Sequence, residues 1–448
     1  MPDLHLNVDR TRGVRAGVEH ALREAIRTLP AGTRLPSSRA LAADLGVARN
    51  TVADVYSHLV QEGYLTGDRG GGTRTVATPV SVPAPTATRE SFRWAEPSGP
   101  IVHDLRPGRP DLSHFPVAAW MAATRHVLDT RPHDALRYDD PRGPVHAREV
   151  LADYLARVRG VRAQPDHILL CSGARQAVAL VAGAIARAGG VSFGYERPGQ
   201  FAIPEQLAHA GLQLRPIPVD DLGARVDQLG DAAGVVLTPA HQFPTGVPLA
   251  PKRRTAVLAW ARAAGAVILE DDYDGEFRYD RQPVGALQGL APDVVAYAGS
   301  ASKTLAPGLR LGWLVVPPRL LDAVLEEKAM NDRHCDTLTH LTLAAMIESG
   351  AYDRHVRAGR LGYRRRRDEL LRALGPRRTR GISAGLQVVL ELPGEDEDAV
   401  LRRLAERGVV TFGLSHFGAD LPPALVLGYG APSQHAWPGT LAALVEAL

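Results

Sequence analysis

The sequence predicts a protein of at least two domains, an N-terminal helical domain and a larger C-terminal α/β domain. The chain has 448 residues, which exceeds the usual size of one domain. The first part shows helical periodicity and ends in a Gly-rich segment, whereas short apolar runs alternate with helical patterns from Ile101 onward. Strands that alternate with helices indicate a largely parallel sheet. We therefore expect domains at residues 1–77 and 101–448, joined by a linker at 78–100.

The composition is that of an ordinary globular protein. Apolar residues make up 45% of the chain, and the net charge of +3 neither requires nor excludes a nucleic-acid partner. No apolar stretch approaches the roughly 18 residues of a membrane span, and the N-terminus does not read as a secretory signal. Cys171 and Cys335 form no metal-ligand spacing. We expect a cytoplasmic protein without a membrane segment and without a bound metal.

The first element is a helix over residues 14–29. Its apolar residues recur with helical spacing on one face, and Pro30 ends it. The residues predicted to face the core are Val14, Val18, Leu22, Ala25, Ile26 and Leu29.

Two short helices joined by a turn follow within residues 35–65. Ser37 or Ser38 can cap the first helix, and Gly46 can supply the tight turn. The second helix should run from about residue 48 to 62. Its exposed start carries hydrogen-bonding side chains, as suits insertion into the major groove of DNA. These side chains are Arg49, Asn50 and Thr51, and the buried face is expected to hold Val52, Val55, Leu59 and Val60.

A hairpin with a Gly-rich tip is predicted at residues 64–76, and a tip of this kind can lie close to a phosphate backbone. Residues 78–100 are rich in Pro, Ala, Thr and Ser and lack apolar periodicity, which indicates an extended linker.

The run LPSSRALAADLGVARNTVADVY, followed by EGYL and a Gly-rich hairpin, resembles the winged helix-turn-helix domain of the GntR superfamily. The resemblance covers about 65 residues and implies a double-stranded DNA operator as the partner, read by a dimer. Ala48 stands where the family often has Ser. The residues that the resemblance implies in DNA contact are Arg39, Arg49, Asn50 and Thr51, with Arg69 and Gly70 from the wing.

Five short apolar runs in the larger domain predict buried strands, because they are bounded by Gly, Pro or Asp. They lie at residues 167–172, 234–238, 266–272, 294–300 and 312–316.

The segment 297–313 carries the residues that an aldehyde phosphate needs. A strand leads into a turn with Ser300, Ser302 and Lys303, and Arg310 follows. The amine can form a Schiff base, while the hydroxyls and the guanidinium can hold the phosphate. The chain has only two other lysines, Lys252 and Lys328, and Arg cannot perform this chemistry.

Other strand ends supply complementary groups. Asp271 can keep a pyridine nitrogen protonated, and the phenol of Tyr273 can hydrogen-bond a ring hydroxyl. The amides of Gly173 and Ala174 begin a helix and form a cradle for phosphate. His241, in another strand-end turn, is expected to be a structural partner and not a catalyst.

These motifs are similar to the fold-type I aminotransferases and, more narrowly, to the MocR regulators, which join that fold to a GntR-type reader. DLRPGRPDLSHFP (104–116), YDDPRG (138–143), TPAHQFPTG (238–246), LEDDYDGEFRY (269–279) and SKTLAPGLRLGW (302–313) carry the resemblance. It implies pyridoxal 5′-phosphate (PLP) on Lys303 and a head-to-tail homodimer in which Tyr138 reaches the partner subunit's phosphate. The other cofactor contacts that it implies are Asp271, Tyr273, Ser172, Gly173, Ala174, Ser300, Ser302 and Arg310.

The chain departs from the aminotransferase pattern at three positions. Gln200 stands where relatives place an aromatic residue that stacks on the ring, with Phe201 as a possible substitute, and Gln200 is assigned no role. Ala202 and Val426 stand where relatives carry arginines that grip an amino-acid carboxylate. This loss disfavours transamination and favours PLP itself as the signal.

Three functions remain open at this point. The first is a DNA-binding regulator whose DNA affinity or geometry is set by PLP or a PLP–amine adduct, with no catalytic residue assigned and at most a residual aminotransferase-like half-reaction. The second is a PLP-dependent aminotransferase with an accessory domain. The third is a regulator whose large domain has lost the cofactor and serves only for dimerisation. The reader motif disfavours the second, and the retained Lys303, Asp271 and Arg310 disfavour the third.

Overall fold

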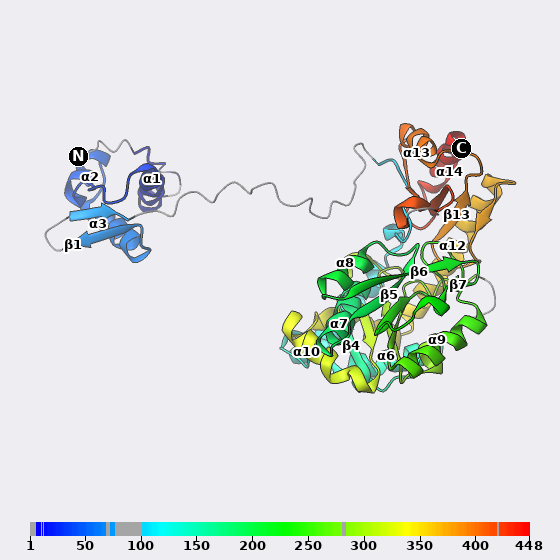
Figure 1. Ribbon diagram of the computed structural model, residues 1–448. Helices are drawn as coiled ribbons and strands as arrows, with labels where there is room; N and C mark the ends of the chain where they lie inside the picture. Colours follow the sequence, from blue (N-terminus) through cyan, green and yellow to red (C-terminus); the bar gives the residue numbers. More distant parts are fainter. Residues whose placement is uncertain are drawn as a thin grey trace. The chain divides into compact units, whose positions relative to one another are not determined.

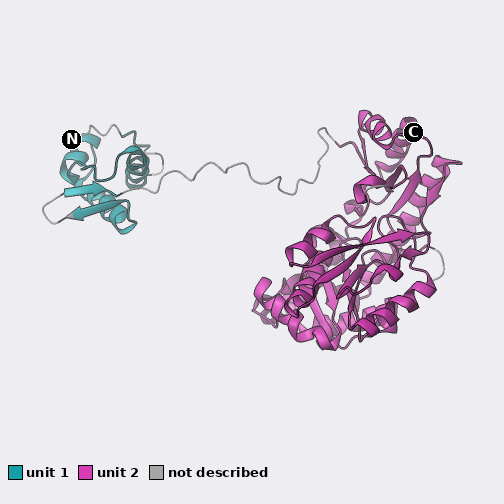
Figure 2. Ribbon diagram, in the orientation of Figure 1, with its two compact units in different colours: residues 1–96 teal, residues 97–448 magenta. Residues whose placement is uncertain are grey.

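The computed structural model describes residues 6–9, 11, 13–68, 72–76, 101–279, 284–418 and 421–448. The chain divides into two compact units, residues 1–96 and 97–448 (Figure 2). The predicted linker at 78–100 and the wing residues Arg69 and Gly70 lie outside the described residues.

The N-terminal unit contains three helices and a two-stranded antiparallel sheet (Figure 1). Its elements are α1 (Val14–Thr28), α2 (Ser38–Leu45), α3 (Arg49–Gln61), β1 (Leu65–Asp68) and β2 (Gly72–Thr75). Strands β1 and β2 form the hairpin that the sequence predicts, with Leu65 opposite Thr75. The three helices and β1 bury a single apolar cluster that includes Val18, Leu22, Leu41, Val52, Leu59 and Leu65.

The turn between α2 and α3 follows the sequence prediction. Ser37 caps α2 by accepting a hydrogen bond from the Ala40 amide at 3.2 Å, and Gly46 adopts the left-handed conformation with φ of 64°. Two predicted core residues are wrong. Val14, the first residue of α1, is 40% exposed, because the described chain places no cover over the start of that helix. Val60 of α3 is 38% exposed. It lies about 80° around the helix from Val52, whereas Tyr56 lies on the buried face and takes its place.

An eight-stranded sheet forms the centre of the C-terminal unit (Figure 1). Strand β11 is antiparallel to both of its neighbours and β7 is antiparallel to β6, whereas the other pairs are parallel. The strands in order across the sheet are β4 (Ile168–Cys171), β11 (Gly312–Val315), β10 (Val295–Ser300), β9 (Val267–Asp272), β8 (Gly234–Leu237), β5 (Ser192–Arg197), β6 (Gln213–Asp220) and β7 (Gly223–Ala224).

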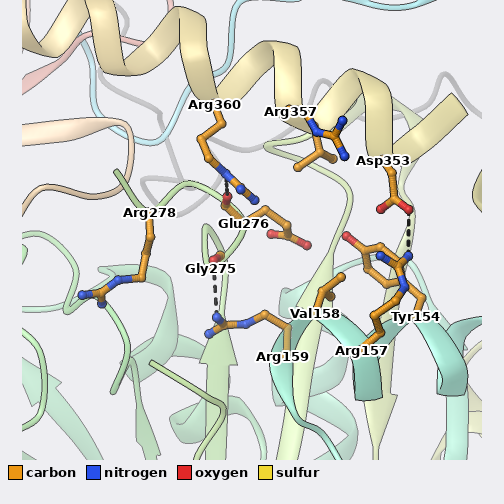
Figure 3. Close-up of a pocket in the computed structure, with 11 residues that line it drawn as sticks. Tyr154, Arg157, Val158, Arg159, Gly275, Glu276, Arg278, Asp353, Arg357 and Arg360 are labelled. Atoms are coloured by element: carbon orange, nitrogen blue, oxygen red, sulfur yellow. Dashed lines mark hydrogen bonds and ion pairs between the residues drawn. The ribbon is translucent and has the colours of Figure 1, made fainter. Parts of the chain in front are cut away.

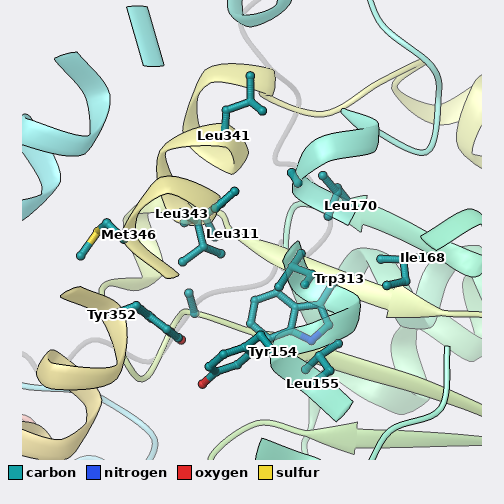
Figure 4. Packing of buried hydrophobic residues seen from close by; sticks show 14 of the residues in the cluster. Tyr154, Leu155, Ile168, Leu170, Leu311, Trp313, Leu341, Leu343, Met346 and Tyr352 are labelled. Atoms are coloured by element: carbon teal, nitrogen blue, oxygen red, sulfur yellow. The ribbon is translucent and has the colours of Figure 1, made fainter. Parts of the chain in front are cut away.

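Helices bury both faces of this sheet, as expected for parallel strands. Alternate residues of β4 belong to different apolar clusters, with Ile168 and Leu170 in one and Leu169 and Cys171 in the other. Figure 4 shows the first cluster, in which Trp313 lies among side chains of β4, α6 and α11. The helices in the part of the chain that forms this sheet are α4 (Val117–Thr130), α5 (Pro132–Leu136), α6 (Val145–Arg159), α7 (Ala174–Arg187), α8 (Ala202–His209), α9 (Pro251–Ala264), α10 (Leu321–Asn331) and α11 (Thr337–Glu348).

A smaller four-stranded sheet follows along the chain, reached through the long helix α12 (Ala351–Leu374). Its strands in order are β12 (Thr379–Arg380), β13 (Gln387–Glu391), β16 (Ala424–Gly428) and β15 (Phe412–Gly413). Side chains of α12, β13, β16, α13 (Glu397–Glu406) and α14 (Trp437–Ala447) form a third cluster. Strand β3 (His103–Asp104) pairs with β14 (Val409–Val410), which ties the start of this unit to its C-terminal part.

Within the described part of the chain, no helix combines the length and apolar character needed to cross a membrane. Cys171 and Cys335 are both buried and free.

Candidate functional site

The predicted site residues of the C-terminal unit follow or precede strands at one edge of the large sheet. Strands β9 and β10 are parallel neighbours, so Asp271 at the end of β9 lies beside the end of β10, which leads to Lys303. Strand β11 is antiparallel to β10, so its first residues, which follow Arg310, reach this same edge. The carboxyl ends of parallel strands are where α/β folds bind ligands. The topology therefore concentrates the predicted groups at one edge.

Lys303 is half-buried, and its Nζ donates a hydrogen bond to the Gly108 carbonyl oxygen at 2.5 Å. Burial lowers the pKa of the Lys303 amine, while the charges of Asp271 and Asp274 act in the opposite sense. The other lysines differ, because Lys252 is exposed and the buried Lys328 is bound to both carboxylate oxygens of Asp332. Lys303 is therefore the amine whose surroundings favour the neutral, nucleophilic form.

Asp271 is 2% exposed and has one satisfied and one unsatisfied oxygen. Its Oδ2 accepts a hydrogen bond from Gln200 Nε2 at 2.8 Å, whereas Oδ1 is buried without a partner in the described structure. Burial, and next the charge of Asp272, raise the pKa of Asp271 to about 7. An unsatisfied carboxylate oxygen of this kind is suited to a cationic N–H donor.

Tyr273 lies in a buried polar network. Its hydroxyl accepts a hydrogen bond from Gln387 Nε2 at 2.8 Å and lies 3.0 Å from His241 Nδ1. The same His241 nitrogen lies 2.8 Å from Asp274 Oδ2. His241 Nδ1 thus contacts both the Tyr273 hydroxyl and the Asp274 carboxylate. The phenol lies near the predicted site but is already engaged by protein groups.

The predicted phosphate cradle lies where β4 meets α7. Gly312 approaches so closely that a Cβ there would lie 2.4 Å from the Gly173 Cα, and the Arg310 guanidinium is near Gly173. Among the described residues, no carboxylate pairs with Arg310 and no acceptor takes the amides of Gly173 and Ala174. The helix N-terminus and the guanidinium therefore present donors to an anion.

Three serines predicted to bind phosphate lie close in sequence to the residues of this cradle. The hydroxyls of Ser172, Ser300 and Ser302 make no hydrogen bond to any residue that the structure describes, although Ser300 is only 7% exposed. Ser300 pairs with Gly312 in the sheet, beside Gly173. These hydroxyls remain available to a ligand.

Tyr138 is not brought to this cluster. Its side chain is 78% exposed, its ring packs edge-on against His334, and the Arg333 guanidinium lies 5.3 Å from the ring centre. An exposed position is what a residue that reaches a second subunit requires.

Gln200 was missed by sequence reasoning, which assigned it no role. The structure joins it to Asp271 across 71 residues of sequence. Phe201, considered as a ring-stacking substitute, instead packs edge-on against His416 at 5.7 Å. Only the unusual residue type at position 200 could have drawn attention to it.

The predicted DNA contacts of the N-terminal unit lie on its surface. Arg39 in α2 and Arg49 and Asn50 at the start of α3 are exposed, and Thr51 is half-buried. Ala48 precedes α3 without a capping side-chain hydrogen bond. The start of α3 therefore presents donors and acceptors outward, as a recognition helix requires.

Known families match both units of the chain. Residues 15–75 match the bacterial regulatory proteins of the gntR family, and residues 101–431 match aminotransferase class I and II. The chain is 33% identical to the HTH-type pyridoxine biosynthesis transcriptional regulator PdxR of Corynebacterium glutamicum, over 95% of each chain. It is 31% identical to the probable rhizopine catabolism regulatory protein MocR of Rhizobium meliloti, over 90% of this chain and 86% of that protein.

The chain belongs to the MocR family of transcription regulators. This MocR-family protein therefore joins a GntR-type helix-turn-helix domain, a DNA-binding module, to a domain of the fold-type I aminotransferases. Its structure is similar to that of an archaeal alanine:glyoxylate aminotransferase, with a TM-score of 0.71 and 26% identity, over 78% of this chain and 91% of that one. Both predicted folds are confirmed.

Proposed function

We propose that this MocR-family protein is a transcription regulator whose affinity for operator DNA is set by PLP, or by a PLP–amine adduct, held on Lys303. One observation carries this proposal. Three groups meet at the same edge of the sheet: Lys303, whose pKa is lowered, Asp271, which has an unsatisfied oxygen, and Arg310, which pairs with no carboxylate in the described part of the chain. Their chemistry is complementary to the aldehyde, the ring nitrogen and the phosphate of PLP.

The residues present fit the cofactor. The unsatisfied Asp271 Oδ1 supplies an acceptor for a protonated ring nitrogen. The Arg310 guanidinium and the amides at the start of α7 supply donors for a dianionic phosphate, with Ser172, Ser300 and Ser302 nearby. When bound, PLP supplies an aldehyde that condenses with an amine and a ring that withdraws electrons.

Each of this chain's groups has a separate part in holding that ligand. Lys303 would hold the aldehyde through its amine, which donates a hydrogen bond to the Gly108 carbonyl oxygen in the described structure. Asp271 would hold the protonated ring nitrogen through Oδ1, while Gln200 donates a hydrogen bond to its Oδ2. Tyr273, whose hydroxyl contacts His241 and Gln387, is proposed to give up one of these contacts and hydrogen-bond the ring hydroxyl.

The positions that grip a substrate carboxylate in aminotransferases favour regulation over catalysis. Ala202 is 7% exposed and Val426 is fully buried, and neither carries a charge. A bidentate carboxylate contact requires a guanidinium, so neither position can grip an amino acid in this way. We propose no catalytic residue for turnover.

The DNA end of the proposal rests on the N-terminal unit. Arg39, Arg49, Asn50 and Thr51 are proposed to contact bases or phosphates of the operator, with Arg69 and Gly70 added from the wing. We propose domains at 1–77 and 101–448 joined by a linker at 78–100, in a cytoplasmic head-to-tail homodimer that places two readers on one operator.

PLP can change DNA affinity only through a difference in its own affinity for two arrangements of the dimer. The test measures operator affinity with and without PLP, for wild type and for Lys303→Ala. We expect PLP to change the affinity of wild type about fivefold or more and to leave Lys303→Ala unchanged, as for typical allosteric coupling. Equal affinity in all four cases would refute the linkage.

A further inference from the structure

A cavity in the C-terminal unit is lined by none of the residues proposed to hold the cofactor. It encloses about 400 Å³ between the end of α6, the turn after β9 and the first turns of α12 (Figure 3). Five arginines line it and two carboxyl groups accompany them. The charged lining residues are Arg157, Arg159, Arg278, Arg357, Arg360, Glu276 and Asp353.

Arg159 is the buried anchor of this cavity, with only 4% of its side chain exposed. Its Nε donates to Asp272 Oδ2 at 2.6 Å, and its Nη1 donates to the Val284 carbonyl oxygen at 3.1 Å. Its Nη2 is buried without a hydrogen-bond partner in the described structure. A buried charged donor without a partner is costly, so a ligand that accepts from Arg159 would be favoured.

The α12 arginines supply charge that the protein does not neutralise. Arg360 donates its Nε to the Glu276 carbonyl oxygen at 2.8 Å, and no carboxylate among the described residues pairs with Arg357 or Arg360. Arg157, by contrast, pairs with Asp353 at 2.8 Å. Figure 3 shows Arg360 pointing from α12 toward Glu276, with Arg159 on the opposite side of the cavity. The lining therefore carries an excess of positive charge.

Glu276 cancels only part of this excess at neutral pH. Burial, and next the charge of Asp272, raise the pKa of its carboxyl to about 7. Below that pH the group is largely neutral and can donate a hydrogen bond to an anion. The charged groups around it, from α6, the end of β9 with the turn that follows, and α12, are Arg157, Arg159, Asp272, Asp274, Arg278, Asp353, Arg357 and Arg360.

We propose that this cavity binds a small oxyanion, such as a phosphate or a dicarboxylate, as an effector site separate from the cofactor site. A concave site whose central arginine has only 4% of its side chain exposed suits a small ligand. Gly275 and Glu276, in the turn after β9, line the cavity and follow Asp271 and Tyr273 closely in sequence, so an occupant would contact the same segment that carries the proposed cofactor contacts.

The test titrates inorganic phosphate and, separately, succinate into the full-length PLP-saturated protein by calorimetry at constant ionic strength, so that the cofactor cradle is filled. Each of the two α12 arginines, Arg357 and Arg360, would donate a charged hydrogen bond to the bound anion. We expect Arg357→Gln/Arg360→Gln to bind the preferred anion about tenfold more weakly or worse. Arg364→Gln, on the same helix but outside the cavity, should bind like wild type.

Further arms locate the signal and identify the ligand. Arg310→Gln should retain anion binding, and Glu276→Gln should bind at least as well as wild type at pH 8. Stronger binding of phosphate than of succinate, or the reverse, assigns the ligand class. The proposal is overturned if wild type binds neither anion, or if Arg310→Gln loses anion binding and the Arg357→Gln/Arg360→Gln variant does not. It is also overturned if the double variant binds DNA differently from wild type but binds both anions with wild-type affinity.

Discussion

At the scale of single residues, burial has opposite effects on the two ionisable groups that define the cofactor site. It lowers the pKa of Lys303 and raises the pKa of Asp271 to about 7, so each group is driven toward its neutral form. A neutral amine is the form that attacks an aldehyde, and a carboxyl with a free oxygen is ready to ionise beside a ring cation. Both pKa shifts lower the stability of the folded protein, and PLP would offset this cost by reacting with the amine and pairing with the carboxylate.

The variant Asp271→Asn tests whether this carboxyl lowers the folding stability of the cofactor-free protein and raises its affinity for PLP. The pKa of Asp271 in the folded protein, about 7, lies above its ordinary value of 3.8, so ionisation destabilises the fold as pH rises from about 4 to about 7. Asn cannot ionise. We expect the cofactor-free variant to unfold ~2 °C or more above wild type at pH 8, with no gain at pH 4, and to bind PLP at least tenfold more weakly.

Thermal unfolding followed at both pH values, together with PLP titration by visible absorbance, measures the two effects. Wild type at pH 4 is the internal control, because its Asp271 is then protonated. If the variant is less stable than wild type at pH 8, the carboxyl is ionised and satisfied in the folded protein, contrary to this account.

The residue scale also shows what could be predicted from the sequence. Lys303, Asp271 and Gly173 could be assigned to one site because each lies at or just after the end of a recognisable strand, and these strand ends share one sheet edge. Gln200 could not be given its contact with Asp271, because the two residues are 71 positions apart and Gln200 ends no strand. The buried surroundings of Glu276 and Arg159 depend on α12, almost 200 residues beyond α6, and carry no local signal.

At the scale of elements, the reader helices depend on local capping that the sequence shows directly. The Ser37 hydroxyl accepts the Ala40 amide at the start of α2, whereas Ser38 makes no such bond. Tyr56 of α3 donates to the Pro36 carbonyl oxygen at 3.0 Å, which holds this cap against the recognition helix.

We expect Ser37→Ala to destabilise α2 by about 1 kcal/mol, because an amide at the helix start loses its acceptor. Hydrogen exchange of the α2 amides in the full-length protein, read by mass spectrometry, measures this as about fivefold faster exchange. Ser38→Ala is the matched control and should exchange like wild type. Equal acceleration in both variants would show that the cap has no special part.

Element positions and directions differ in how far sequence predicts them. The apolar runs place β4, β8, β9, β10 and β11 within one or two residues of their observed bounds. The antiparallel direction of β11 does not follow from its composition, because an apolar run reads the same in either direction. Helical spacing located α3 but wrongly assigned Val60 to its buried face. The spacing shows where the centre of an apolar face lies, but it does not show how wide the buried part of that face is.

At the scale of the whole molecule, the proposed dimer makes a prediction about mixed subunits. Tyr138 is 78% exposed and contacts His334 and Arg333, so we propose that it completes the phosphate site of the partner subunit. Mixing Lys303→Ala with Tyr138→Phe subunits then generates one site that has both Lys303 and Tyr138. We expect half of the sites in the mixed dimer to bind PLP with wild-type affinity.

Differently tagged subunits, co-expressed and purified through both tags, allow that affinity to be measured by visible absorbance. The Tyr138→Phe homodimer should bind PLP several-fold more weakly at both sites, since each loses a hydrogen bond to phosphate. If the mixed dimer binds no better than the Tyr138→Phe homodimer, Tyr138 acts within its own subunit or has no part in binding.

The central claim is that one particular amine holds the cofactor, and the chain's three lysines allow a direct measurement. Full-length protein is incubated with PLP, reduced with borohydride to fix any covalent bond, digested and analysed by peptide mass spectrometry. We predict the pyridoxyl modification on Lys303, with Lys252 and the ion-paired Lys328 unmodified at equal PLP concentration. An unmodified Lys303 peptide, or modification of Lys252 or Lys328 in its place, would contradict the account.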